Sequence, residues 1–171
     1  MDYYHIKSER LNFRKLTEQD IPSWAEFFVN NAGLQYFNFD LSKSKEALAE
    51  EWIQIQLKRY QNNNYGHLAA ELKTDGTFIG IAGLLPKQLK GKQEYEVAYS
   101  LKPAYWGKGY GTEMATRMKN FGLKNMDVKR LISMISFGNE ASISVAKKNG
   151  MKFLFDTEFD GELLHIFGIT R

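Results

Sequence analysis

The stretch Tyr105-Trp106-Gly107-Lys108-Gly109-Tyr110-Gly111-Thr112-Glu113-Met114 decides the fold class of this chain. It follows a strand-like segment, and its three glycines stand at every second position. Glycine has no Cβ, so the backbone N–H groups of such a turn are open to a bulky anion. The unpaired N–H groups and positive end of a following helix would also suit a phosphate or diphosphate. A helix is predicted there because apolar residues fall at a helical spacing: Tyr110, Met114, Ala115, Met118 and Phe121.

Three kinds of phosphate-binding loop can be compared with this stretch. A P-loop needs Gly-x-x-x-x-Gly-Lys-Ser/Thr, but Lys108 is followed by glycine. A dinucleotide loop needs Gly-x-Gly-x-x-Gly after a continuous apolar strand, and neither the spacing nor the strand fits. The third kind is the coenzyme A loop of the GCN5-related N-acetyltransferases, written Gln/Arg-x-x-Gly-x-Gly/Ala. Residues 106–111 resemble it, with Trp106 where the family usually has Gln or Arg. This substitution is typical of the branch resembling the ribosomal-protein N-terminal acetyltransferases.

Further segments resemble the same family and occur in the family's order along nearly the whole chain. They include an opening strand, the strand that leads into the glycine loop, and a last helix in which Met151 replaces the usual Phe. No single piece is specific, but together they are similar to a GCN5-related N-acetyltransferase throughout. The matching segments are residues 8–16, 17–20, 78–84, 96–106 and 139–151.

The alternation of strand-like and helix-like segments predicts an α/β fold in one domain, residues 1–171. The resemblance implies a mixed, mostly antiparallel sheet of about seven strands, with splayed fourth and fifth strands and about four flanking helices. Strands are expected at residues 11–15, 67–72, 78–85, 94–101, 130–136, 153–158 and 163–169. Helices are expected at residues 24–30, 44–60, 109–123 and 139–149, and a solvated loop is expected at the lysines around Gly91.

Composition excludes several other classes of protein. The chain has 171 residues and no cysteine, which rules out disulfides, thiolate metal ligands and a cysteine nucleophile. The formal charge of +3 suits an anionic cosubstrate and is too small to indicate nucleic-acid binding. The 3 histidines are scattered, so no metal site is predicted. No signal peptide or membrane-spanning segment is recognisable, so we expect a cytoplasmic monomer or homodimer without a membrane partner.

The resemblance implies acetyl-CoA as cosubstrate. The glycine loop would cradle the diphosphate, with Lys108 adding a positive charge. The neighbouring strand end would pair with the pantetheine arm like an added strand, and Asn139 matches an asparagine that hydrogen-bonds the pantetheine region. A helix N-cap is a compatible explanation for Asn139, and a solvated side chain is the alternative for Lys108. The implied cofactor-binding residues are Tyr99, Ser100, Leu101, Gly107, Lys108, Gly109, Tyr110, Gly111, Thr112 and Asn139.

Proton transfer is where the sequence departs from the family. Many members have a tyrosine in the last helix that protonates the leaving thiolate, and Ala146 stands at that position. Ser142, one turn earlier, is the candidate in its place, although a helix-surface serine explains it equally well. The candidate bases are Glu96, on the same strand face as Ala98, and Glu158, where a related branch places a carboxylate that positions a water. Each carboxylate can also be a solvated charge.

The acceptor implied by the resemblance is an amine that attacks the acetyl group directly in a ternary complex. It can be a protein N-terminal α-amine, a polyamine or a small-molecule amine. Deprotonating a lysine-type amine at pH 7 costs roughly 4–5 kcal/mol, whereas an α-amine costs about 1 kcal/mol. A site without the tyrosine acid and with an uncertain base is therefore easier to reconcile with an α-amine. The loop-like Tyr36-Phe37-Asn38-Phe39 is the candidate for acceptor contact, whereas Trp24, Phe27 and Phe28 are expected in the core.

A second class of function remains open. The same fold could serve as a non-catalytic acyl-CoA-binding sensor or interaction module. Ala146 and Met151, which depart from the family pattern, give this alternative some weight.

Overall fold

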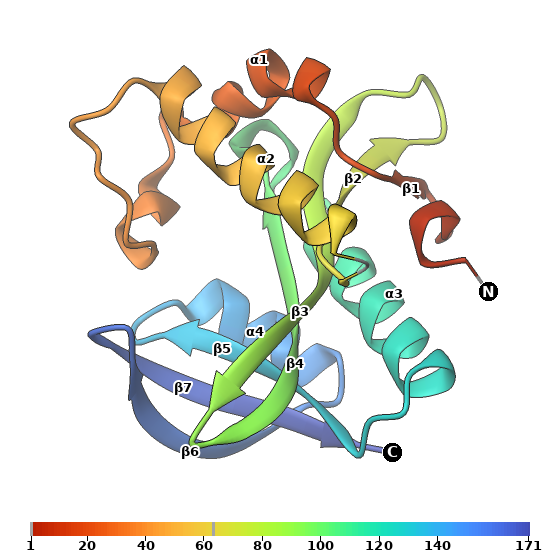
Figure 1. The fold of residues 1–171 in the computed structure, drawn as a ribbon, viewed down its shortest axis with the longest axis vertical. Helices are drawn as coiled ribbons and strands as arrows, with labels where there is room; N and C mark the ends of the chain where they lie inside the picture. The colour runs from red at the N-terminus through yellow and green to blue at the C-terminus, as the bar shows by residue number, and fades with distance from the viewer. Residues whose placement is uncertain (1, 63) are drawn as a thin grey trace.

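A computed structural model describes residues 2–62 and 64–171. Within those residues the chain forms a seven-stranded sheet in the order β1-β2-β3-β4-β5-β7-β6 (Figure 1). Neighbouring strands pair antiparallel except β4 and β5, which are parallel. The predicted mixed, mostly antiparallel sheet is therefore confirmed. The strands are β1 (Leu11–Arg14), β2 (His67–Leu72), β3 (Phe78–Leu89), β4 (Lys92–Leu101), β5 (Arg130–Ser136), β6 (Lys152–Phe159) and β7 (Glu162–Thr170).

Four α-helices occur in the described part of the chain, as the resemblance implies: α1 (Ile21–Trp24), α2 (Lys45–Gln61), α3 (Tyr110–Asn125) and α4 (Glu140–Lys148). The first is much shorter than expected. The segment predicted as a helix at 24–30 continues from α1 only as the 3-10 helix η3 (Ala25–Phe28). A 3-10 helix has about three residues per turn, so Trp24 and Phe27 fall on one side, where their buried rings stack at 4.6 Å.

β3 and β4 extend beyond the strands predicted at residues 78–85 and 94–101, and they join as a hairpin. Its strands meet at Lys90 and Gly91, which have φ angles of 49° and 74°. Positive φ at both central residues is the geometry of a type I′ turn, which matches the twist of the flanking strands. The solvated loop predicted around Gly91 is therefore only this short exposed turn, and Lys87 is a strand residue opposite Glu94.

The parallel pair β4 and β5 holds together over a very short length. Glu96 and Ile132 are its single register pair within the described residues. By comparison, β5 and β7 pair continuously from Arg130–Thr170 to Ser136–Leu164. Beyond Glu96 the two strands diverge, as the predicted splay requires.

Side chains of β4 alternate between the two faces of the sheet. Tyr99 contacts the start of α3 on one face, because a Cβ on Gly111 would lie 3.3 Å from its ring. On the opposite face, α2 packs on β2: the Tyr60 hydroxyl donates to the His67 carbonyl, and Gln56 Oε1 accepts from the His67 backbone N–H at 3.0 Å. In Figure 1, α1 and α2 lie together at the top of the view.

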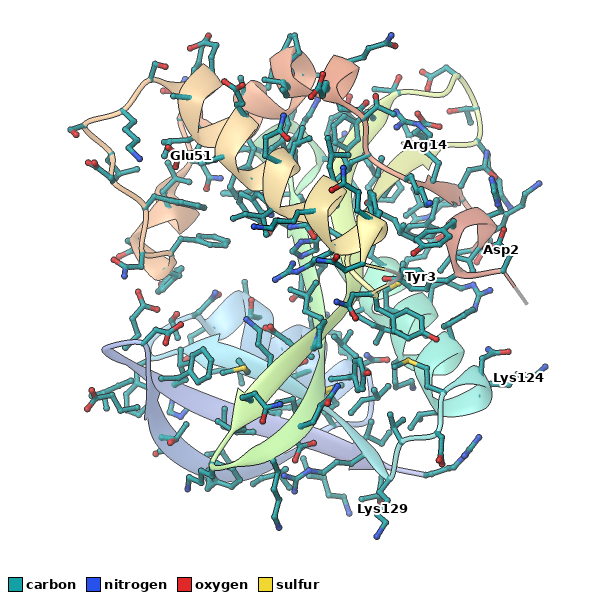
Figure 2. All side chains as sticks on the ribbon, viewed as in Figure 1. Asp2, Tyr3, Arg14, Glu51, Lys124 and Lys129 are labelled. Carbon is teal, nitrogen blue, oxygen red and sulfur yellow. The ribbon has the colours of Figure 1, made fainter. Side chains whose placement is uncertain are left out.

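Tyr3 ties the N-terminal segment to the middle of the sheet, where Figure 2 labels it. Its hydroxyl donates to the Gly66 carbonyl at 2.5 Å and accepts from the Leu84 backbone N–H at 2.9 Å. Its ring packs on Phe121 of α3 at 5.2 Å. Tyr3 is therefore part of the core, although it precedes β1. Over the described residues, none of the helices combines the length and apolar composition needed to cross a bilayer.

Candidate active site

A cavity of about 380 Å³ opens where β4 and β5 separate. On the face covered by α3 and α4, its lining includes Tyr99, Asn139, Ser142 and Ala146. On the face covered by α2, its lining includes Trp52, His67, Lys87 and Glu96. Residues of the β6–β7 turn complete it: Phe159, Asp160 and Glu162. Because it reaches both faces, the cavity can receive one molecule from each side of the sheet.

The backbone of β4 exposes hydrogen-bonding groups to this cavity. The Val97 carbonyl accepts from Ser133 Oγ of β5 at 3.3 Å, so it points toward β5. Along a strand paired on one side, successive residues point their N–H and C=O groups in alternate directions. The backbone N–H and C=O groups of Tyr99 and Leu101 therefore also point toward β5, and those of Ser100 point toward β3. Since β5 has diverged at that height, the N–H and C=O of Tyr99 open into the cleft.

The glycine loop leads from β4 into α3. Gly107 and Gly109 have φ angles of 75° and 81°, a conformation that side chains with a Cβ rarely adopt. Gly109 caps the helix, and its carbonyl accepts from the Glu113 N–H at 3.1 Å. Among the described residues, no acceptor meets the N–H groups of Tyr110, Gly111 or Thr112. Bare N–H groups at a helix N-terminus fit an anionic diphosphate.

Lys108 and Trp106 flank these glycines. The Lys108 ammonium lies 3.4 Å from the Ala104 carbonyl and 5.5 Å from the centre of the Tyr105 ring. Trp106 Nε1 donates to the Leu101 carbonyl at 2.8 Å. Trp106 therefore satisfies the carbonyl of the last residue of β4. A phosphate contact by Lys108 stays a prediction.

The start of α4 forms one wall of the cavity. Asn139 Oδ1 accepts from the Ser142 N–H at 3.2 Å, the N-cap contact expected from the sequence. The side chains of Ser142 and Tyr99 both line the cavity and interact with each other. Burial raises the pKa of Tyr99 above its usual value, and the nearby Ser142 hydroxyl opposes that rise. The structure thus brings Asn139, Ser142 and Tyr99 together beside Ala146.

On the opposite face, Glu96 lies in the cavity with Lys87 3.4 Å away. His67 is buried nearby, and its Nδ1 accepts from Trp52 Nε1 at 3.4 Å, so a neutral ring carries its proton on Nε2. Burial lowers the pKa of His67 to about 3, and the positive charges of Arg59 and Lys87 add to the effect. Sequence reasoning missed Lys87, His67 and Trp52 as lining residues, because their proximity depends on strand pairing and helix packing.

Glu158 does not lie with the other candidates. Its side chain is exposed, and it is outside the residues that line the cavity. The neighbouring Phe159, Asp160 and Glu162 do line it. The role predicted for Glu158 stays a prediction.

The predicted acceptor loop borders the cavity. Tyr36, Phe37 and Asn38 line it, at the end of the 3-10 helix η4 (Ala32–Tyr36). The Tyr36 hydroxyl donates to the Gly138 carbonyl at 3.0 Å, and Ser136 Oγ donates to the Tyr36 carbonyl at 3.0 Å. These two bonds fasten the loop to the β5–α4 connection, which closes one side of the cleft.

Comparison with known proteins agrees with this architecture. A curated relative, the uncharacterized N-acetyltransferase YnaD of Bacillus subtilis, is 26% identical over 152 residues, 86% of this chain and 82% of the relative. An acetyltransferase structure from Agrobacterium tumefaciens matches with a TM-score of 0.80 and 21% identity over 100% of this chain and 96% of its own. The ribosomal L7/L12 α-N-protein acetyltransferase RimL, solved with coenzyme A, matches with a TM-score of 0.78 and 14% identity, covering 95% of each chain. At such identities the structural likeness shows a shared fold.

The family itself is shown by a sequence model. The acetyltransferase (GNAT) domain matches residues 10–152, which contain the glycine loop, the splayed strands and α4. The family predicted from the sequence is confirmed, and the structural neighbours include the ribosomal-protein branch that it resembles. This chain belongs to the GNAT acetyltransferases.

Proposed function

We propose that the protein transfers the acetyl group of acetyl-CoA to a primary amine by direct attack in a ternary complex. The supporting observation is the divergence of β4 from β5, which leaves the backbone of Tyr99 open above a helix N-terminus with bare N–H groups. An extended pantetheine arm can add to such a strand edge. RimL, with the same fold, was solved with coenzyme A.

In this proposal the two faces of the sheet bind different substrates. The glycine loop from Gly107 to Thr112 holds the diphosphate, and the Tyr99 N–H donates to the carbonyl oxygen as negative charge develops there. The acceptor enters from the α2 face, where Glu96 takes its proton directly or through a water. The nitrogen then bonds to the acetyl carbon as the carbon–sulfur bond breaks. Thiols have a pKa near ~8.5, so the sulfur leaves as thiolate or takes a proton from water or Ser142.

The acceptor class is an amine bounded by apolar and acidic groups. Phe37, Trp52 and Phe159 supply the apolar wall, and Asp160 and Glu162 supply negative charge at the β6–β7 turn. An α-amine fits best, because it needs the least help to lose its proton. Peptide N-termini, polyamines and small-molecule amines all present suitable groups.

Thiol release with a panel of amines tests the proposal. Acetyl-CoA is incubated with a serine-initiated peptide, spermidine and free amino acids, and free thiol is followed over time. Steady thiol release with any acceptor supports the enzyme. Tight coenzyme A binding without turnover over the whole panel supports the alternative, a binding module, which Ala146 at the usual tyrosine position favours.

A further inference from the structure

Arg10 connects the N-terminal segment to the glycine loop. Its Nη1 donates to the Lys108 carbonyl at 2.9 Å, and its guanidinium lies 4.3 Å from the centre of the Tyr110 ring. Its Nη2 runs beside Gly109, where an added Cβ would lie 3.4 Å away. Arg10 therefore contacts three successive residues of the loop.

The contact with Lys108 sets the direction of one peptide plane. A trans peptide points its C=O and the following N–H in opposite directions, and the described residues contain no cis peptide. With the Lys108 carbonyl turned toward Arg10, the Gly109 N–H points away from Arg10. Glycine at φ 81° has few steric restraints of its own, so an external contact is needed to select one orientation.

Arg10 also neutralises the carboxylate of Glu113 in the first turn of α3. Its Nε lies 2.7 Å from Oε2 of Glu113, and its backbone N–H donates to Oε1 at 2.7 Å. Ser8 Oγ donates to the same oxygen at 2.6 Å. The Glu113 side chain is 13% exposed and the Arg10 side chain 43%, so water screens the pair only from the Arg10 side. Without the Arg10 side chain, the carboxylate would keep its hydrogen bonds from Ser8 and from the backbone of residue 10 but would lose its opposite charge, in the helix turn that presents the bare N–H groups.

We infer that Arg10 is a positioning residue for the cosubstrate: it holds the loop in its binding conformation and cancels the charge of Glu113. The inference rests on the proposed function, because it assumes that the loop receives the diphosphate of coenzyme A. Arg10 acts through the loop and takes no part in the chemical step. Its loss should therefore weaken only binding that depends on the diphosphate.

Comparing acetyl-CoA with S-acetyl-pantetheine, which lacks the diphosphate, tests this directly. Arg10→Met should lower kcat/KM for acetyl-CoA roughly tenfold, mainly through KM, as expected for lost hydrogen bonds to a charged group. It should leave kcat/KM for S-acetyl-pantetheine within about twofold of wild type. Arg10→Lys keeps the positive charge but lacks the planar guanidinium group. Its kcat/KM for acetyl-CoA should therefore lie between those of the wild type and Arg10→Met. The control is Arg14→Met, because Arg14 pairs with Asp20 and Glu71 and should lower stability without changing the substrate ratio.

A double variant separates this role from a structural one. If Glu113 repels the diphosphate once Arg10 is gone, Arg10→Met with Glu113→Gln should bind acetyl-CoA more tightly than Arg10→Met alone. A purely structural ion pair would make the double variant no better. Equal losses with both substrates, or an unchanged KM for acetyl-CoA, overturn the inference. Should Arg10→Met fail to fold, Arg10→Lys and Glu113→Gln give the same comparison. Failure of the proposed function looks different, because wild-type protein would then release no thiol with any acceptor, whether or not it binds coenzyme A.

Discussion

The ammonium nitrogen of Lys87 lies 3.4 Å from Oε2 of Glu96, inside the cavity on the α2 face. The two side chains, on the neighbouring strands β3 and β4, are only 25% and 13% exposed. A pair this enclosed is screened less by water than a surface ion pair. The candidate base thus has its counter-ion in the pocket, and an incoming ammonium group must be accommodated beside a second positive charge.

Changing Glu96 to Gln tests the base. Turnover should fall roughly 10²-fold or more near pH 7, with little change in coenzyme A affinity, because proton removal is lost and the loop is untouched. The deficit should shrink at high pH, where solvent deprotonates the amine. Steady-state rates from pH 6 to 10 measure this (roughly the range over which amines titrate). Glu94→Gln is the control, since Glu94 pairs with Arg130 outside the main cavity. The same pH-dependent loss in Glu158→Gln, with Glu96→Gln active, would transfer the role to Glu158.

Replacing Gly109 by Val should abolish the thermal stabilisation by coenzyme A. Valine strains the positive-φ backbone and places a side chain where the bare N–H groups must meet the diphosphate. In the wild type, ligand at about 100 times its Kd should add about 2.7 kcal/mol. Gly76→Val is the matched control, because Gly76 has a φ of 76° and lies in a remote open turn. Differential scanning fluorimetry with and without coenzyme A compares them. A response of the wild type to NAD or ATP but not to coenzyme A would contradict the assignment of the loop.

Ser142→Ala and Tyr99→Phe should have non-additive effects on turnover. Both variants remove one partner of the same side-chain interaction, so the second change has nothing further to remove. Each single variant should lose about fivefold in kcat, the typical net value of one polar interaction, and the double variant should lose about the same. A double-mutant cycle on kcat, with coenzyme A affinity measured in parallel, checks this. Losses that multiply would mean that the two hydroxyls act separately.

His67 should make the protein less stable in mild acid. Its pKa is lowered to about 3 by burial, so the folded state keeps the ring neutral where the unfolded chain binds a proton. The stabilisation is complete above a pH near ~6.5 and is lost as pH falls toward the folded pKa. Between pH 7 and 5 the loss should be about 2 kcal/mol. Urea unfolding at several pH values measures it. His67→Gln should flatten that part of the profile, and an equal slope in both proteins would assign it to other groups.

The features set by neighbouring residues were predictable from the sequence. The glycine loop depends on φ angles that glycine alone adopts easily, and the cap of α4 depends on Asn139 and the Ser142 N–H, three positions apart. Both features are determined by residues that lie close together in the sequence. The same holds for β5, whose predicted range of residues 130–136 matches its observed limits.

The features set by pairing between segments were not predictable. Lys87 looked like a loop residue until the β3–β4 register placed it beside Glu96. The face taken by Glu158 depends on the β6–β7 register, which shifts between Phe153 and Phe155. A shift of one residue moves every following side chain to the other face, and nothing local to Glu158 specifies it. The bulge thus decides which hairpin residues reach the cavity.

The single register pair between Glu96 and Ile132 has a mechanical consequence. Backbone hydrogen bonds join the four strands from β1 through β4 into one block, and β5, β7 and β6 into a second block. Between the two blocks they are limited to the surroundings of that single register pair. Protection against amide exchange should therefore differ between the blocks, each opening as a cooperative unit with its own free energy. A ligand lying in the seam would touch both, so its binding should make the two opening energies converge. The gap between β4 and β5, which is the proposed substrate site, is then also the place where a bound ligand changes the rigidity of the protein.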